Sequence, residues 1–108
     1  MNDTTAALRV DAERLRARFD ALAAIGATGD GGVHRPALGQ DHLRARQWFL
    51  DEGRAIGLDT HVDGAGNHSA TLACGQAGAP ALLLGSHLDS VRHGGRFDGA
   101  LGVLAALE

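Results

Sequence analysis

Cysteine is nearly absent from this chain, which has a single thiol, Cys74, among 108 residues. One cysteine cannot form an internal disulfide framework, so the composition excludes a small disulfide-stabilised scaffold and fits a reducing compartment. Long apolar runs are also missing, and none approaches the roughly 20 residues that a membrane-spanning helix needs. Residues Met1 to Val10 lack a basic region followed by an apolar run, so we expect no secretory signal.

A basic surface is lacking as well, because the formal net charge is −3 and arginines form no cluster. Binding to a nucleic acid depends on such a cluster, so the sequence does not favour a nucleic-acid partner. The chain is 44% hydrophobic and 21% charged, which is typical of a soluble protein, and its length allows at most one domain. We therefore expect a cytoplasmic protein that binds neither membranes nor nucleic acids.

Apolar residues recur at helical spacing in three segments. The pattern predicts helices from about Ala12 to Ala24, after the N-cap residue Asp11, from about Asp41 to Ile56, and from Gly99 to Glu108. Residues 1–10 precede the first helix and are predicted to be a flexible tail. Residues 26–40 hold five glycines and are predicted to form a long loop.

Three shorter segments have strand character. Residues 58–63 and 69–74 flank a glycine-rich turn and predict a hairpin. Residues 81–85 are uniformly apolar, which is expected of a central strand that is covered on both faces. The predicted order is α-α-β-β-β-α, and we expect an α/β fold with a mixed sheet.

The residues with the clearest chemical potential follow the predicted central strand. His87 comes directly after it, and ligands of open α/β sheets bind beyond the carboxyl ends of strands. Asp89 lies two residues on, so it would point to the same side in extended backbone and could orient the imidazole of a metal-binding His87. The alternative is a histidine that only packs or bonds a loop carbonyl.

Asp98 stands at the start of the last predicted helix, on a glycine-rich turn. A carboxylate has two oxygens and can bridge two cations, but aspartate is also a favoured helix N-cap, so both interpretations stay open. Gly94 and Gly95 either bring Asp98 back toward His87 or form an ordinary tight turn. His93 lies in the same loop and is a weaker candidate.

These segments resemble the hydantoinase/carbamoylase branch of the dinuclear-metal amidohydrolases in the M20 peptidase clan. That branch includes N-carbamoyl-L-amino acid hydrolases, allantoate amidohydrolases and beta-ureidopropionases. The resemblance covers about residues 11–108. The segments that carry it are Ile25-Gly26-Ala27-Thr28, Gly32-Val33-His34-Arg35-Pro36-Ala37-Leu38, Asp63-Gly64-Ala65-Gly66-Asn67, Gly85-Ser86-His87-Leu88-Asp89-Ser90 and Gly94-Gly95-Arg96-Phe97-Asp98-Gly99-Ala100-Leu101-Gly102-Val103-Leu104.

The resemblance implies a role for each candidate residue. His87 would be a terminal ligand of one metal, Asp98 would bridge two metals, and Asp89 would be the supporting carboxylate behind His87. It also implies part of the α/β/α catalytic domain of a dinuclear-metal exopeptidase type, with residues 11–108 as its N-terminal part and without the lid domain. The resemblance further implies two divalent ions, of zinc, manganese, cobalt or nickel. It also implies a small ureido or carbamoyl acid as substrate and a homodimeric parent enzyme.

The chain departs from the family's pattern at several points. Ser90-Val91-Arg92-His93 replaces the usual Thr-Val-Pro-Asn, and His34 replaces a common threonine. The family's glutamate pair, its two further histidine ligands and its substrate-binding arginine would lie beyond Glu108. We therefore expect this chain alone to be inactive. There are two alternatives: an aminoacylase or peptidase of the same clan, and a non-catalytic truncated fragment. The first is disfavoured, because the clan's other branches usually carry an Asp-Met-Lys-Gly type segment where this chain has Asp98-Gly99-Ala100-Leu101.

Overall fold

The computed structural model describes residues 7–108, so most of the predicted tail lies outside the described residues. Its helices are α1 (Ala12–Ala24), α2 (Gln40–Ala55) and α3 (Ala100–Leu107). The short strands are β1 (Gly32–Val33), β2 (Asp59–Val62), β3 (His68–Thr71) and β4 (Gly94–Gly95). The helices predicted from apolar periodicity are thus confirmed, with α1 at the predicted bounds. Within residues 7–108 no helix has the length and apolarity to cross a membrane.

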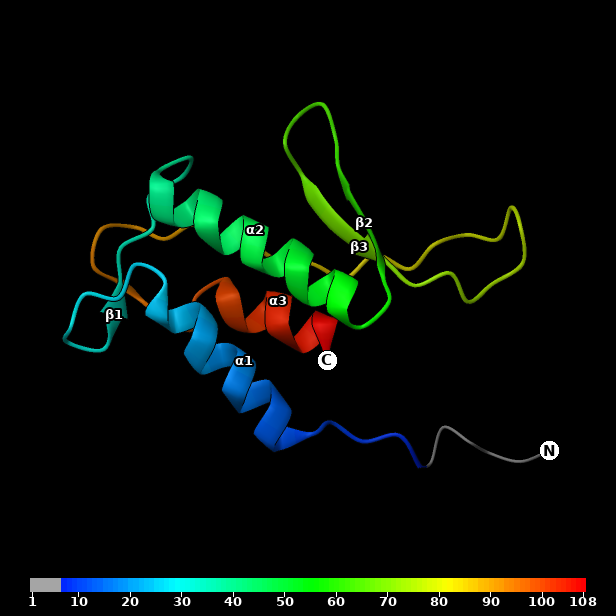
Figure 1. Cartoon of the computed structure of the whole chain (residues 1–108), viewed down its shortest axis with the longest axis horizontal. Coiled ribbons are helices and arrows are strands. Elements are labelled where there is room, and N and C mark those ends of the chain that lie inside the picture. Colours follow the sequence, from blue (N-terminus) through cyan, green and yellow to red (C-terminus); the bar gives the residue numbers. More distant parts are fainter. Residues whose placement is uncertain (1–6) are drawn as a thin grey trace.

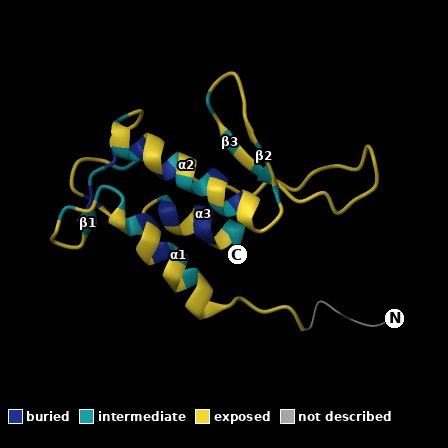
Figure 2. Ribbon diagram, viewed as in Figure 1, coloured by how far each residue is buried: buried dark blue, intermediate teal, exposed yellow. Residues whose placement is uncertain are grey.

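The hydrophobic core lies among the three helices. Figure 1 shows α3 between α1 and α2, and Figure 2 shows that the buried positions of all three helices face this centre. The buried core residues come from each helix and from one residue of the preceding loop, and they are Phe19, Leu22, Ala45, Leu88, Ala100, Val103 and Leu104. Because α3 is almost wholly apolar, it can be covered from two sides, which explains its central position.

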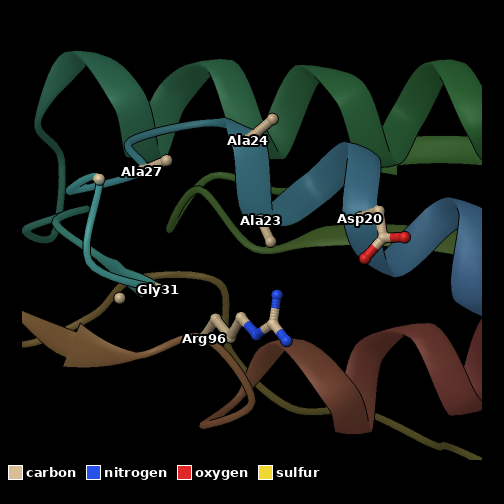
Figure 3. A pocket seen from close by; sticks show the side chains of 8 residues that line it. Asp20, Ala23, Ala24, Ala27, Gly31 and Arg96 are labelled. Atoms are coloured by element: carbon tan, nitrogen blue, oxygen red, sulfur yellow. The ribbon is translucent and has the colours of Figure 1, made fainter.

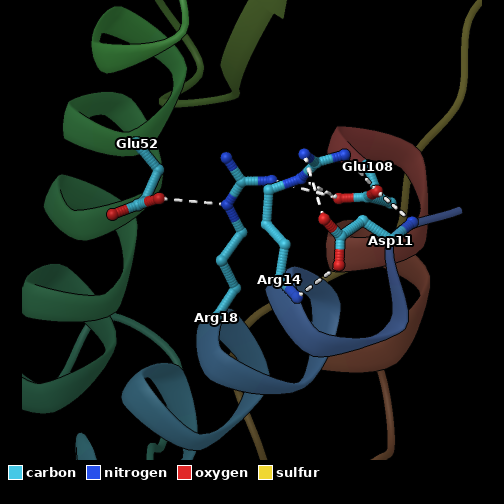
Figure 4. A network of polar contacts seen from close by, with 5 residues as sticks. All are labelled: Asp11, Arg14, Arg18, Glu52 and Glu108. Carbon is cyan, nitrogen blue, oxygen red and sulfur yellow. Dashed lines mark hydrogen bonds and ion pairs between the residues drawn. The ribbon is translucent and has the colours of Figure 1, made fainter.

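An ion-pair network ties the first helix to the last (Figure 4). Arg14 donates two bonds to the carboxylate of Glu108, and Arg18 joins Glu108 to Glu52 of α2. The backbone N–H of Asp11 also donates to Glu108, while the Asp11 carboxylate caps α1 at the N–H of Arg14. These bonds, with Arg14 first among them, lower the pKa of Glu108 to about 2. The network therefore fixes the relative positions of all three helices.

The β2–β3 hairpin is antiparallel, as predicted, and packs on α2 at Gly53. A Cβ at Gly53 would lie 3.1 Å from Ala70 and 3.3 Å from Thr60, so only a small residue allows the hairpin to approach the helix this closely. The turn is held by Asp63, whose carboxylate accepts from the backbone of Ala65 and from Asn67.

The α/β class is confirmed, but the predicted central strand is not formed. Residues 81–85 are irregular, and Leu82 and Leu83 are 85% and 89% exposed. Both sheets of the described residues are two-stranded and antiparallel, so the predicted mixed sheet was wrong, and the order is α1-β1-α2-β2-β3-β4-α3. The physical reason is that a central strand needs a hydrogen-bonding neighbour on each side, and residues 7–108 provide none for this segment. Figure 1 shows it within an extended loop that leaves the helical layer.

Candidate metal centre

The segment that carries His87 is anchored by one side chain. Leu88 is buried in the core, whereas the flanking His87 and Asp89 face the surface, with 50% and 39% of their side chains exposed. Neighbouring residues of an extended chain point to opposite sides, so burying Leu88 turns both polar side chains outward together. This local pattern brings His87 and Asp89 to the same side of the chain.

The contacts of His87 define which ring nitrogen is free. Its Nδ1 lies 3.0 Å from the backbone oxygen of Asp89 and 3.3 Å from Oδ1 of the same residue. Both oxygens can only accept a bond, so Nδ1 is the donor in this contact, and in the neutral ring the lone pair is then on Nε2. The hydrogen bond therefore goes to a loop carbonyl, which was the alternative that the sequence left open, while the expected carboxylate oxygen lies close by at 3.3 Å. Backbone carbonyls and carboxylates both orient metal-binding histidines in proteins.

The free Nε2 atom of His87 faces Asp98. The distance from Nε2 to Oδ2 of Asp98 is 3.6 Å, which is longer than a hydrogen bond. Two ligands at about 2.1 Å from one tetrahedral ion would lie roughly 3.4 Å apart, so the separation fits a nitrogen and an oxygen that share a cation. The alternative role of Asp98 as N-cap is not observed, because Gly99 is the N-cap of α3 and makes no side-chain capping bond.

Two glycines, the N-cap residue Gly99 and Gly102 of α3, allow the His87 segment to lie this close to the helix. Gly99 has φ +71°, and a Cβ there would overlap the carbonyl oxygen and the ring of His87. A Cβ at Gly102 would come within 2.8 Å of Ser86. Neither role was predicted from the sequence.

Gly94 and Gly95 form a short strand, although the N–H of Gly94 also closes a turn by donating to the carbonyl oxygen of Val91, so the tight-turn interpretation holds only for the residues just before them. The two glycines are strand β4, which pairs antiparallel with Gly32 and Val33 of β1, and neither has a positive φ. His93 lies beside this pair and opposite His34, with 6.1 Å between the ring centroids. The predicted loop 26–40 is thereby attached to the loop that leads to Asp98.

Among the described residues, His87 and Asp98 are the two facing side chains here that could bind a metal. Within residues 7–108 no three side chains of histidine, cysteine, aspartate or glutamate come together as a metal site. A catalytic zinc ion usually has about three protein ligands, so the donors fit part of a metal centre. A hollow of about 250 Å³ beside α1, lined by residues that include Asp20, Ala23 and Arg96, contains neither His87 nor Asp98 (Figure 3).

Comparisons with known proteins support the resemblance. The chain is 39% identical over 99 residues to an N-carbamoyl-L-amino-acid amidohydrolase of Pseudomonas sp. (strain NS671), covering 92% of this chain and 24% of that protein. It is 40% identical over 86 residues to an allantoate amidohydrolase of Bacillus subtilis (strain 168), covering 80% and 21%. The crystal structure of a hydantoinase/carbamoylase family amidase from Burkholderia ambifaria superposes with a TM-score of 0.90 at 46% identity, covering 94% and 25%.

No family model matches the chain. The chain spans about a quarter of the length of the curated relatives that it matches. The resemblance predicted from the sequence motifs is confirmed by these matches, because they combine high identity with the same fold over nearly all of the chain.

Proposed function

We propose that this chain, which is homologous to one part of the hydantoinase/carbamoylase family amidases, contributes half of the metal centre of an amidohydrolase. The substrate class is a small acid with a linear ureido or carbamoyl C–N bond, such as an N-carbamoyl-L-amino acid or allantoate. The observation that carries the proposal is the arrangement of His87, whose Nδ1 lies against Asp89 and whose Nε2 lies 3.6 Å from Oδ2 of Asp98.

His87 would bind one divalent ion, and Asp98 would bind both that ion and a second one. Both ions would be zinc, manganese, cobalt or nickel. Such ions supply Lewis-acid polarisation of the scissile carbonyl or amidine group and activation of a water molecule. Asp89 keeps the proton of His87 on Nδ1, so that the ring presents its lone pair outward. The other ligands, the general base and the substrate-binding groups would come from parts of the enzyme that residues 7–108 do not include.

Zinc titration of the purified chain tests the half-site. We expect weak Zn²⁺ binding, measured by competition with a chromophoric chelator, and at least a tenfold loss of affinity in His87→Ala and in Asp98→Ala. His61→Ala is the matched control, because His61 is an exposed histidine of the β2–β3 hairpin. Unchanged Zn²⁺ affinity in both site variants would refute the assignment.

Activity assays test the reaction class. The 108-residue chain should not hydrolyse N-carbamoyl amino acids, and measurable hydrolysis that Asp98→Ala abolishes would show that the centre is complete. The product of the full gene, assayed side by side on N-carbamoyl, ureido and N-acetyl substrates, should prefer the first two. A preference for N-acetyl or peptide substrates would assign the enzyme to the aminoacylases or peptidases instead.

A further inference from the structure

Arg35 is a charged side chain in an unusual environment. It is 1% exposed, and it is the largest of the fully buried side chains. Its guanidinium donates to three backbone carbonyl oxygens: to Leu88 from Nε at 2.9 Å, and to Leu22 and Ile25 from Nη1 at 3.0 and 2.8 Å. Buried arginines normally pair with a carboxylate, so a buried guanidinium that serves only backbone carbonyls in these contacts requires an explanation.

The carbonyl that Nε contacts belongs to Leu88, the residue between His87 and Asp89. The backbone of Arg35 holds the same segment, because its N–H donates to Ser90 Oγ at 2.8 Å and its carbonyl accepts from the Ser90 N–H at 2.7 Å. Side chain and backbone together therefore hold residues 88 and 90 on both sides of Asp89. The other end of the guanidinium is fixed to the C-terminal end of α1, at Leu22 and Ile25.

The surrounding chain is shaped to admit this side chain. A Cβ at Gly26, which has φ +80°, would lie 2.8 Å from Cγ of Arg35. Residues 85–90 belong to no strand, so they lack the ladder of hydrogen bonds that would fix a strand end in a sheet. Arg35 supplies such bonds in its place, and arginine suits the task because its planar fork donates in several fixed directions at once.

We infer that Arg35 is a positioning residue for the metal centre: it fastens the His87–Asp89 segment to the end of α1 and so holds the imidazole and its supporting carboxylate in place. The inference rests on the proposed function, since it gives Arg35 a role toward the same centre. Lysine at this position keeps the charge but has one nitrogen, which cannot serve both Leu88 and the two carbonyls of α1.

The test compares Arg35→Lys with two control variants of the same chain. Arg92→Lys makes the same exchange at an exposed arginine that lies between His87 and Asp98 in the sequence, and Leu50→Ala lowers stability by truncating a buried residue of α2. We expect Arg35→Lys to bind Zn²⁺ about tenfold more weakly, as for other partners that orient metal ligands, with both controls unchanged when measured on folded protein. An Arg35→Lys affinity equal to that of the wild type would overturn the inference.

Amide hydrogen exchange gives a second readout that needs no metal. In folded Arg35→Lys the Ser90 N–H should exchange at least tenfold faster, while amides in the middle of α2 keep their rates. If His87→Ala weakens Zn²⁺ binding and Arg35→Lys changes neither affinity nor exchange, the metal site stands and the role of Arg35 is refuted. If His87→Ala leaves Zn²⁺ binding unchanged, the proposed function fails, and the Ser90 exchange rate alone decides whether Arg35 holds the segment.

Discussion

The close approach of α3 to His87 makes a sharp prediction for Gly99→Ala. Gly99 has φ +71°, a conformation that costs an L-residue about 1–3 kcal/mol. The new Cβ would also overlap the carbonyl oxygen and ring of His87, and such overpacking typically costs about 1–3 kcal/mol more. The expected loss of about 2–6 kcal/mol is a large share of the free energy of unfolding of a typical domain, which is roughly 5–15 kcal/mol.

Urea unfolding followed by circular dichroism measures this loss. With a slope of about 1–3 kcal/mol per molar urea, the midpoint of Gly99→Ala should fall by at least about 0.7 M. Gly85→Ala is the matched control: it lies in the same motif, its Cβ would meet no atom within 4 Å, and it has no positive φ. The control isolates the entropy that alanine removes from the unfolded chain, which is worth about 0.4–1 kcal/mol in favour of folding.

The reasoning fails if Gly99→Ala and Gly85→Ala unfold at the same urea concentration. That result would mean that His87 does not lie against the N-terminus of α3, and the 3.6 Å separation between His87 and Asp98 would lose its structural basis. A Gly99→Ala protein that is destabilised as expected but keeps its Zn²⁺ affinity would show that the His87–Asp98 pair tolerates a shift of the helix.

Three further predictions concern stability and association. The bonds of Glu108 to Arg14 and its other partners lower its pKa to about 2, so its contribution to stability should be present above about pH 4.5 and lost toward pH 2. In Glu108→Gln the urea midpoint should therefore change less between these pH values than in the wild type. An equal change in both proteins would contradict the prediction. Leu83 is 89% exposed beside other apolar residues, so sedimentation velocity should show self-association of the chain, and Leu83→Glu should reduce it. A monomeric wild-type chain would count against this prediction. Phe97 stacks on Phe19 at 4.8 Å, so Phe97→Ala should lower the free energy of unfolding in urea by at least about 0.5–1.5 kcal/mol, and no change would refute the contact.

The helices were predictable because their signals are local. The spacing of Leu15, Phe19 and Leu22 defines one face of α1, and Asp11 marks its start, so the bounds Ala12–Ala24 follow from the sequence without tertiary information. The residues around His87 and Asp98 left structural and metal-binding interpretations open, and only the family resemblance implied two metal ligands. The structure brings the two side chains to 3.6 Å from one another, while metal binding itself stays a prediction.

The remaining features depend on contacts between distant segments. The apolar composition of residues 81–85 indicates a strand that others would cover, but it does not supply the neighbours, and the segment stays irregular. The need for glycine at position 99 arises only when His87 packs against the helix. Burial of Arg35 is equally invisible to a local pattern, because arginine is mostly a surface residue and its carbonyl partners lie at Leu22 and Leu88.

The bonds between the first and last helices have a consequence for how the chain folds as it is made. The backbone of Asp11 and the side chain of Arg14 bond to Glu108, so partners of α1 are separated from it by almost the whole described chain. A ribosome adds about 5–20 residues per second, so α1 waits for several seconds or more with its apolar face uncovered before α3 is synthesised. The contacts of α2 with the β2–β3 hairpin do not involve α3, so that part of the chain can pack first, whereas the core between α1 and α3 closes last.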